Sequence, residues 1–264
     1  MILDGKALSK KIEAELRAKV TGLGKPVTLA VVIVGDDPVS VKYINRKKAV
    51  GENVGVDVQL FEYEADIVEA DLKLEIEKLV ARQDIDGVLV QLPLPDHLNR
   101  EEIINLIPPA KDPDSLGEDA KVPSPVVRAV QEILKTSQIE LADKKIVVVG
   151  QGKLVGRPVA LWLASDGYDV TVVDSKVVDV GAITRHADIL ILGAGQPGLI
   201  KLDMIKDGVV IIDAATSEAS GRLAGDADPA CADKAVLFTP VPGGVGPLTL
   251  VLLFANLLDL VDGQ

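Results

Sequence analysis

The chain has 264 residues and a net charge of −12, and hydrophobic residues make up 48% of it. This length suits one large domain or two of ordinary size, and the apolar content is ample for their cores. The acidic balance excludes the basic face that nucleic acid or an anionic membrane surface requires. The single cysteine, Cys231, excludes an internal disulfide. Because the N-terminus also lacks the layout of a signal peptide, we expect a cytoplasmic protein.

Helices and strands alternate along the first part of the chain. Apolar residues at every fourth position from Leu8 to Val20 predict an opening amphipathic helix, which Gly22 and Gly24 end. The segments that follow are predicted as a strand at 27–34, a helix at 38–54, a strand at 56–63, a helix at 66–82 and a strand at 86–92. This alternation indicates a parallel sheet with right-handed crossovers.

A proline-rich and acidic stretch, residues 108–125, has no apolar period and predicts a boundary. A second α/β segment follows, with strands expected at 145–149, 169–174, 188–192, 208–213 and 235–238. The apolar run at 248–261 is too short to span a bilayer and carries Asn256 and Asp259, so it is predicted as a buried core helix.

A glycine-rich turn follows the strand at 145–149 and precedes a helical pattern. This layout is typical of a pyrophosphate site, although a tight turn without ligand is an open alternative. Asp174 ends the next strand, where an acid accepts hydrogen bonds from the ribose of NAD; an ordinary solvated acid is the alternative. Together they predict a dinucleotide site made by Gly150, Gln151, Gly152, Lys153, Val155, Gly156, Asp174 and Ser175.

Four residues form a possible chemical site. Tyr43 and Lys47 share one face of the helix at 38–54, and Gln91 and Asp114 fall where ligands of open α/β sheets bind. Each alone is more typical of an exposed lysine, a packed tyrosine or a turn-forming aspartate. Lys42, Arg46, Lys47 and Lys48 form a basic cluster that could attract an anionic substrate.

Residues 239–247 combine three prolines with three glycines. Such a loop is stiff and bare of side chains, which suits a surface for a flat ligand, and a rigid lead into the last helix is the alternative. The two histidines, His97 and His186, lack the spacing of metal ligands, so no metal is expected.

Several segments, taken in order, resemble the bifunctional methylenetetrahydrofolate dehydrogenase/cyclohydrolase family. They are Ser-Val-Lys-Tyr-x-x-x-Lys (40–47), Gln-Leu-Pro-Leu-Pro (91–95), Lys-Asp-Pro-Asp (111–114), the glycine loop at 150–158, and Pro-Val-Pro-Gly-Gly-Val-Gly-Pro (240–247). The resemblance implies two α/β domains that flank an active-site cleft. Residues 1–121 with the last helix, 247–264, would bind folate, and residues 122–246 would form a Rossmann-like NAD(P)-binding domain.

The same resemblance implies the reaction. A nicotinamide would oxidise 5,10-methylenetetrahydrofolate to the methenyl form, and water would open this to 10-formyltetrahydrofolate. Lys47 would be the general acid/base, Gln91 would orient it, Tyr43 would stack on the folate ring, and Asp114 would hold the pterin edge. Pro242, Gly243 and Gly244 would contact substrate. The family also implies a homodimer.

The chain departs from the family pattern at several positions. The loop after Asp114 is shorter, Ser115 replaces a glycine, and Ala215 stands where a glycine normally lets the backbone approach the nicotinamide. Gln151 and Asp174 replace residues typical of NADP-using members, which favours NAD over NADP. A cyclohydrolase with impaired hydride transfer, a non-catalytic folate- or nucleotide-binding protein, and a different Rossmann dehydrogenase are the alternatives.

Overall fold

The computed structural model describes residues 1–219 and 222–263, which form two compact α/β units. Unit 1 consists of Met1–Ser9 and Val126–Thr249, and unit 2 consists of Lys10–Pro125 and the C-terminal segment from Leu250. The predicted class, α/β with two domains and parallel sheets, is confirmed. Unit 1 includes the first nine residues, which the predicted division placed in the other domain.

Unit 2 is built on a parallel three-stranded sheet in the order β2-β1-β3. Its strands are β1 (Thr28–Val34), β2 (Asp57–Tyr63) and β3 (Gly87–Val90). Its helices are α2 (Pro38–Val54), α3 (Glu69–Ala81) and α4 (Arg100–Ile104), together with most of α1 (Gly5–Leu23) and of α8 (Val245–Asp262), and a short turn η1 spans Pro109–Lys111.

The ends of α2 follow directly from local chemistry. The Asp37 carboxylate accepts a hydrogen bond from the Ser40 amide at 2.8 Å, and Pro38 occupies the first turn, where its missing amide costs nothing. Gly55 ends the helix in the left-handed conformation at φ 87°. The predicted helix at 38–54 therefore has the observed bounds.

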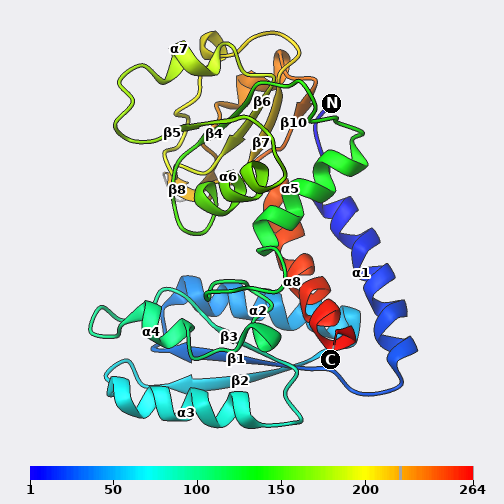
Figure 1. Ribbon diagram of the computed structural model, residues 1–264, viewed down its shortest axis with the longest axis vertical. Helices are drawn as coiled ribbons and strands as arrows, with labels where there is room; N and C mark the ends of the chain where they lie inside the picture. Colours follow the sequence, from blue (N-terminus) through cyan, green and yellow to red (C-terminus); the bar gives the residue numbers. More distant parts are fainter. Residues whose placement is uncertain (220–221, 264) are drawn as a thin grey trace. The chain divides into compact units, whose positions relative to one another are not determined.

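Helices cover both faces of the β2-β1-β3 sheet, as Figure 1 shows for α2 and α3. On one face, Leu72 and Ile76 of α3 pack with alternate strand residues such as Val32. On the other face α8 lies close, because a Cβ on Gly87 would come within 2.6 Å of Leu257. A Cβ on Gly51 of α2 would likewise come within 3.4 Å of Phe254. The predicted core helix is therefore buried, although its length and composition alone would also suit a membrane span.

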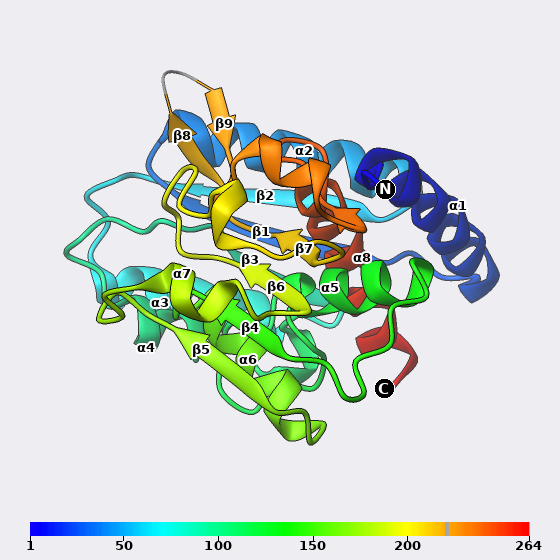
Figure 2. The ribbon, with the colours of Figure 1, turned by 90° about the horizontal axis from the view of Figure 1, so that it is seen from above.

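Unit 1 holds a parallel five-stranded sheet in the order β10-β7-β6-β4-β5. Its strands are β4 (Ile146–Val149), β5 (Val170–Val173), β6 (Ile189–Leu192), β7 (Val210–Asp213) and β10 (Leu237–Phe238). Its other elements are α5 (Pro125–Thr136), α6 (Gly156–Ser165), α7 (Val180–Thr184), η2 (Leu202–Met204), η3 (Pro229–Asp233) and an antiparallel hairpin of β8 (Ser217–Ala219) and β9 (Arg222–Ala224), visible in Figure 2.

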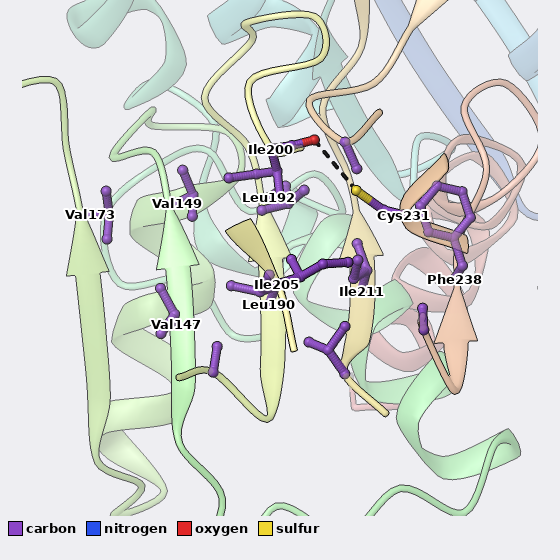
Figure 3. Close-up of a cluster of buried hydrophobic side chains, with 14 residues drawn as sticks. Val147, Val149, Val173, Leu190, Leu192, Ile200, Ile205, Ile211, Cys231 and Phe238 are labelled. Atoms are coloured by element: carbon purple, nitrogen blue, oxygen red, sulfur yellow. Dashed lines mark hydrogen bonds between the residues drawn. The ribbon is translucent and has the colours of Figure 1, made fainter. Parts of the chain in front are cut away.

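One core cluster of unit 1 lies on one face of this sheet. Figure 3 shows Val149, Leu190, Ile211 and Phe238 projecting from neighbouring strands toward the same layer. Cys231 is fully buried there, and its thiol donates to the Ile200 carbonyl at 3.5 Å. Burial raises the pKa of this thiol to about 11, so the lone cysteine acts as a small apolar residue.

The chain start belongs to this unit because it extends the edge of the sheet. Leu3 donates its amide to the Phe238 carbonyl at 2.9 Å, and the Phe238 amide donates to Met1 at 3.0 Å. Other details differ from the sequence prediction, and several strands, such as β3 and β7, are shorter than expected. Helix α1 continues through Gly22, α3 begins three residues later than predicted, and the β8–β9 hairpin was not expected.

Candidate functional site

Lys47 and Gln91 meet in unit 2. Lys47 projects from α2, Gln91 follows β3 directly, and the lysine Nζ donates to Gln91 Oε1 at 2.9 Å. The other end of the Gln91 amide is held because its Nε2 donates to the Leu92 carbonyl at 2.6 Å. This second bond fixes the amide so that its oxygen faces the amine.

The Lys47 amine lies out of water. Burial lowers the pKa of Lys47, and the negative charge of Asp114 opposes that effect in part. Desolvation is the cause of the lowering. The expectation of an exposed lysine is wrong, because Lys47 is partly buried.

Asp114 is placed by a second, fully buried carboxylate. Asp112 accepts hydrogen bonds from the amides of Asp114 and Ser115 on Oδ1, and from those of Leu116 and Gly117 on Oδ2, at 2.8–3.2 Å. Burial raises the pKa of Asp114, Lys47 lowers it and Asp112 raises it further. The site therefore pairs an amine shifted toward its neutral form with a carboxyl shifted toward its protonated form.

The shortened loop after Asp114 closes on itself. Ser115, which stands where the family pattern has glycine, adopts the left-handed conformation at φ 57°. Its hydroxyl donates to the Val122 carbonyl across the loop. Such a backbone conformation costs about 1 kcal/mol for a residue with a side chain, and the Asp112 and Val122 contacts compensate it.

Tyr43 lies one turn before Lys47 on α2 and is partly buried. The Arg46 guanidinium lies 5.8 Å from the centroid of its ring, a cation–π contact. Tyr43, Lys47, Gln91 and Asp114 all belong to unit 2. Gln91 follows β3 at the carboxyl edge of the sheet and bonds Lys47, whereas Tyr43 shares α2 with Lys47 and Asp114 lies in the loop after η1. Ligands of open α/β sheets bind at such an edge.

A pocket of about 540 Å³ opens in unit 1 at the carboxyl ends of β4, β5 and β6. The strand order reverses at β4, which lies between β5 and β6, and dinucleotides bind at such switch points. The pocket is lined by Val149, Gly150, Gln151, Gly152, Val173, Asp174, Ser175, Val177, Val178, Val180, Gly193, Ala194, Gln196 and Leu199. Its size and its mixture of apolar walls with a few polar groups suit a nucleotide.

Bare backbone makes this pocket possible. A Cβ on Gly150 would lie 2.5 Å from the Gly193 carbonyl oxygen, whereas one on Gly152 would meet nothing closer than 3.9 Å. No side chain caps α6 at Val155, but the Arg157 amide of its first turn donates to the Gly152 carbonyl at 3.1 Å and Pro158 has no amide. The bare backbone of the glycine loop, more than the helix N-terminus, therefore leaves room for a pyrophosphate group.

Five of the eight predicted nucleotide residues line the pocket and three do not. Lys153, Val155 and Gly156 are absent from its wall. A Cβ on Gly156 would lie 2.0 Å from the Gly150 oxygen, and the Val155 side chain occupies the space beside Gly193. Val155 and Gly156 thus shape the turn beneath the pocket.

The proline-glycine loop is only partly available to a ligand. Pro242, which follows a cis peptide bond, is exposed, and Gly243 is half-buried at φ 109°. Gly244 is buried, and its amide donates to Pro240 at 2.7 Å. A Cβ on Gly5 would lie 1.9 Å from the Gly244 oxygen, so this part of the loop packs against the start of α1.

Sequence reasoning missed the supporting carboxylates and part of the pocket wall. Asp112 lies inside the Lys-Asp-Pro-Asp motif, but the motif assigned no role to it. Asp226 accepts backbone amides of the pocket wall after β6, and nothing in the sequence marked it beyond its being acidic. The wall residues after β6, which include Gly193 and Ala194, could have been found from the Gly-Ala-Gly-Gln run that follows a strand. Among the described residues, no group of acids, histidines and cysteine could hold a metal ion.

Comparison with known proteins identifies both parts of the chain. Residues 3–114 match the catalytic domain of tetrahydrofolate dehydrogenase/cyclohydrolase, and residues 124–264 match its NAD(P)-binding domain. The chain is 40% identical to the bifunctional protein FolD of Bacillus licheniformis, over 97% of this chain and 95% of that protein. It is 39% identical to FolD of Aquifex aeolicus, over 98% and 94%.

Solved structures agree. The FolD crystal structure from Campylobacter jejuni, a methylenetetrahydrofolate dehydrogenase/cyclohydrolase, superposes with a TM-score of 0.96 at 34% identity, covering 100% of this chain and 99% of that one. The Trypanosoma brucei enzyme, complexed with NADP cofactor and inhibitor, gives 0.93 at 32% identity, with 100% and 97% covered. The chain therefore belongs to the tetrahydrofolate dehydrogenase/cyclohydrolase family, as its motifs predicted, and is an enzyme of that family.

Proposed function

We propose that the chain oxidises 5,10-methylenetetrahydrofolate to 5,10-methenyltetrahydrofolate and hydrolyses this to 10-formyltetrahydrofolate, with Lys47 as the general acid/base. The observation that carries the proposal is the 2.9 Å bond from the Lys47 amine to Gln91, in surroundings that lower the pKa of that amine. A lysine can accept a proton near neutral pH only when its pKa is lowered in this way.

In the hydrolysis, the neutral Lys47 amine takes a proton from the water that attacks the one-carbon bridge. The ammonium so formed returns that proton to the pterin nitrogen as its bond to the bridge breaks, and the carbinol proton leaves as the formyl group forms. Gln91 keeps the amine aimed, because its own amide is held by Leu92. Asp114, shifted toward its protonated form, can donate as well as accept at the pterin edge.

The oxidation uses the pocket of unit 1. A bound nicotinamide coenzyme supplies the hydride acceptor. The bare backbone of Gly150 and Gly152 would accommodate its pyrophosphate, and Asp174 would accept hydrogen bonds from its ribose. Tyr43 stacks on the folate ring, and the exposed Pro242 and half-buried Gly243 offer backbone surface for substrate.

NAD is the coenzyme that this pocket favours. Among the described residues that line it, Asp174 is the one charged side chain, and none is basic. A 2′-phosphate placed about 4 Å from this carboxylate would be repelled by about 4 kcal/mol per unit charge at an effective dielectric of about 20. The Asp174 carboxylate also accepts the Lys176 amide at 2.9 Å, which holds it at the end of β5.

Parallel spectrophotometric assays with 5,10-methylenetetrahydrofolate and either NAD or NADP test the proposal. We expect reduced coenzyme to form faster with NAD, and 5,10-methenyltetrahydrofolate to be hydrolysed in a separate assay. Hydrolysis without coenzyme reduction would favour a cyclohydrolase alone, and ligand binding without either turnover would favour a binding protein. Equal or better turnover with NADP would refute the coenzyme assignment. The homodimer and the cytoplasmic location stay predictions.

A further inference from the structure

The backbone that follows β6 forms one wall of the nucleotide pocket. Gly193, Ala194, Gln196 and Leu199 all line it. Gly193 is held by the sheet itself, because its amide donates to the Val149 carbonyl at the end of β4 at 2.8 Å. Short loops of small residues are adaptable, so the shape of this wall depends on what holds it from behind.

A single buried side chain holds it. Asp226 is fully buried, and its carboxylate accepts three successive amides: those of Ala194 at 2.6 Å, Gly195 at 3.2 Å and Gln196 at 2.6 Å. The amides of Ala194 and Gly195 donate to Oδ2 and that of Gln196 to Oδ1, so both oxygens are used.

The backbone around Asp226 adds two more bonds to the same loop. The Ile200 amide donates to the Asp226 carbonyl at 2.9 Å, and the Gly198 amide donates to the Gly225 carbonyl at 3.0 Å. The loop from Ala194 to Ile200 is therefore fastened at both ends by one short segment. A carboxylate that accepts several amides at once is well suited to fix a backbone, because such charge-assisted bonds are roughly twice as strong as neutral ones.

We propose that Asp226 is a positioning residue of the nucleotide site, whose buried carboxylate fixes the backbone of Ala194–Gln196 in the form that the coenzyme binds. The inference rests on the proposed nucleotide-binding function of this pocket. Asp226 lies behind the wall and does not line the pocket itself, so it acts through the loop. The role needs its negative charge, since all three of its partners are donors.

The variant Asp226→Asn tests this role. Asparagine has the same shape, but in either orientation its NH₂ group faces at least one of the three amides. We expect the Kd for NAD, measured by calorimetry, to rise about tenfold or more, because small displacements of positioning groups have large effects. The KM for 5,10-methenyltetrahydrofolate in the hydrolysis should stay within about twofold of wild type, since the loop belongs to the nucleotide unit.

Asp112→Asn is the matched control. Asp112 is also buried, at 3% exposure, and accepts backbone amides only, but it lies in unit 2. It should leave NAD binding unchanged. Equal weakening of NAD binding in both variants would mean a general loss of rigidity and would overturn the proposal, as would wild-type affinity in Asp226→Asn. A wild-type protein that binds neither NAD nor NADP would instead refute the nucleotide function.

If Asp226→Asn does not fold, hydrogen exchange of the wild-type protein without coenzyme decides the matter. The amides of Ala194, Gly195 and Gln196 should exchange slowly although they belong to a short loop, because Asp226 accepts all three. Rapid exchange at these amides would overturn the proposal.

Discussion

Replacing Lys47 separates its chemistry from its charge. Lys47→Met removes the amine, and Lys47→Arg keeps a positive charge beside Asp114 but cannot give it up near neutral pH. If the neutral amine carries protons, both variants lose the hydrolysis. If Lys47 acts only through its charge, arginine retains much of the activity.

The two quantities to compare are the loss of catalytic rate and the change in the free energy of unfolding. Loss of a general acid/base lowers the rate by about 10²- to 10⁴-fold, or about 3 to 5 kcal/mol of transition-state stabilisation. The fold loses less. Lys47→Met removes the 2.9 Å bond to Gln91, a loss of about 1.5 to 3 kcal/mol, but also removes an amine whose burial is unfavourable. We therefore expect the free energy of unfolding to change by about 1 kcal/mol, within the usual range of point variants.

The assay follows the loss of the methenyl chromophore over a range of pH. In the wild type the rate should rise with pH through the pKa of Lys47, which lies below its usual value. Neither variant should show that rise. Lys47→Arg with wild-type hydrolysis at neutral pH would refute the general-base role, and so would an unchanged pH profile in Lys47→Met.

Two further predictions concern the nucleotide unit. Asp174→Ala should weaken the binding of NAD and shift the ratio of kcat/KM for NADP to that for NAD upward by about tenfold or more, because the repulsion of a 2′-phosphate is removed. The KM for the folate substrate should not change. A larger effect on folate than on NAD would contradict the assignment of Asp174 to the ribose. Burial raises the pKa of Asp213 from 3.8 to about 6. The folded protein thus binds more protons than the unfolded chain between these values, and stability from Asp213 falls as pH rises. Urea unfolding should show wild type losing about 3 kcal/mol relative to Asp213→Asn between about pH 4 and pH 7; a constant difference would contradict the shift.

Local signals were enough to predict most of the helices and strands, and to place Tyr43 and Lys47 on one helix face. Pro38 and Gly55 bound α2 in sequence as in structure, and the β-branched runs of β1 and β4 are buried as expected. The β8–β9 hairpin escaped detection because its strands are three residues long and mostly polar or small. A spacing of four on a helix placed Tyr43 beside Lys47, but no spacing could reveal that burial removes water from the amine.

The supporting acids were beyond sequence reasoning for a related reason. Asp112 and Asp226 resemble any other loop aspartate until the chain folds, since their partners are backbone amides, which every residue carries. Their roles depend on which amides converge on them. Lys153 shows the opposite kind of failure. Its position in the glycine loop predicted a contact with the nucleotide, but in the folded chain Lys153 does not line the pocket.

The interleaving of the two units has a consequence for how the protein is made on the ribosome. Unit 1 needs the first nine residues together with a segment more than a hundred residues later, and unit 2 is completed by Leu250 and the residues that follow. Phe254 and Leu257, which pack near α2 and β3, therefore follow the whole of unit 1 in the chain. Although its sheet emerges early, unit 2 cannot bury this apolar face until all of unit 1 has been synthesised, so a nascent chain exposes the face meanwhile and needs chaperone protection there.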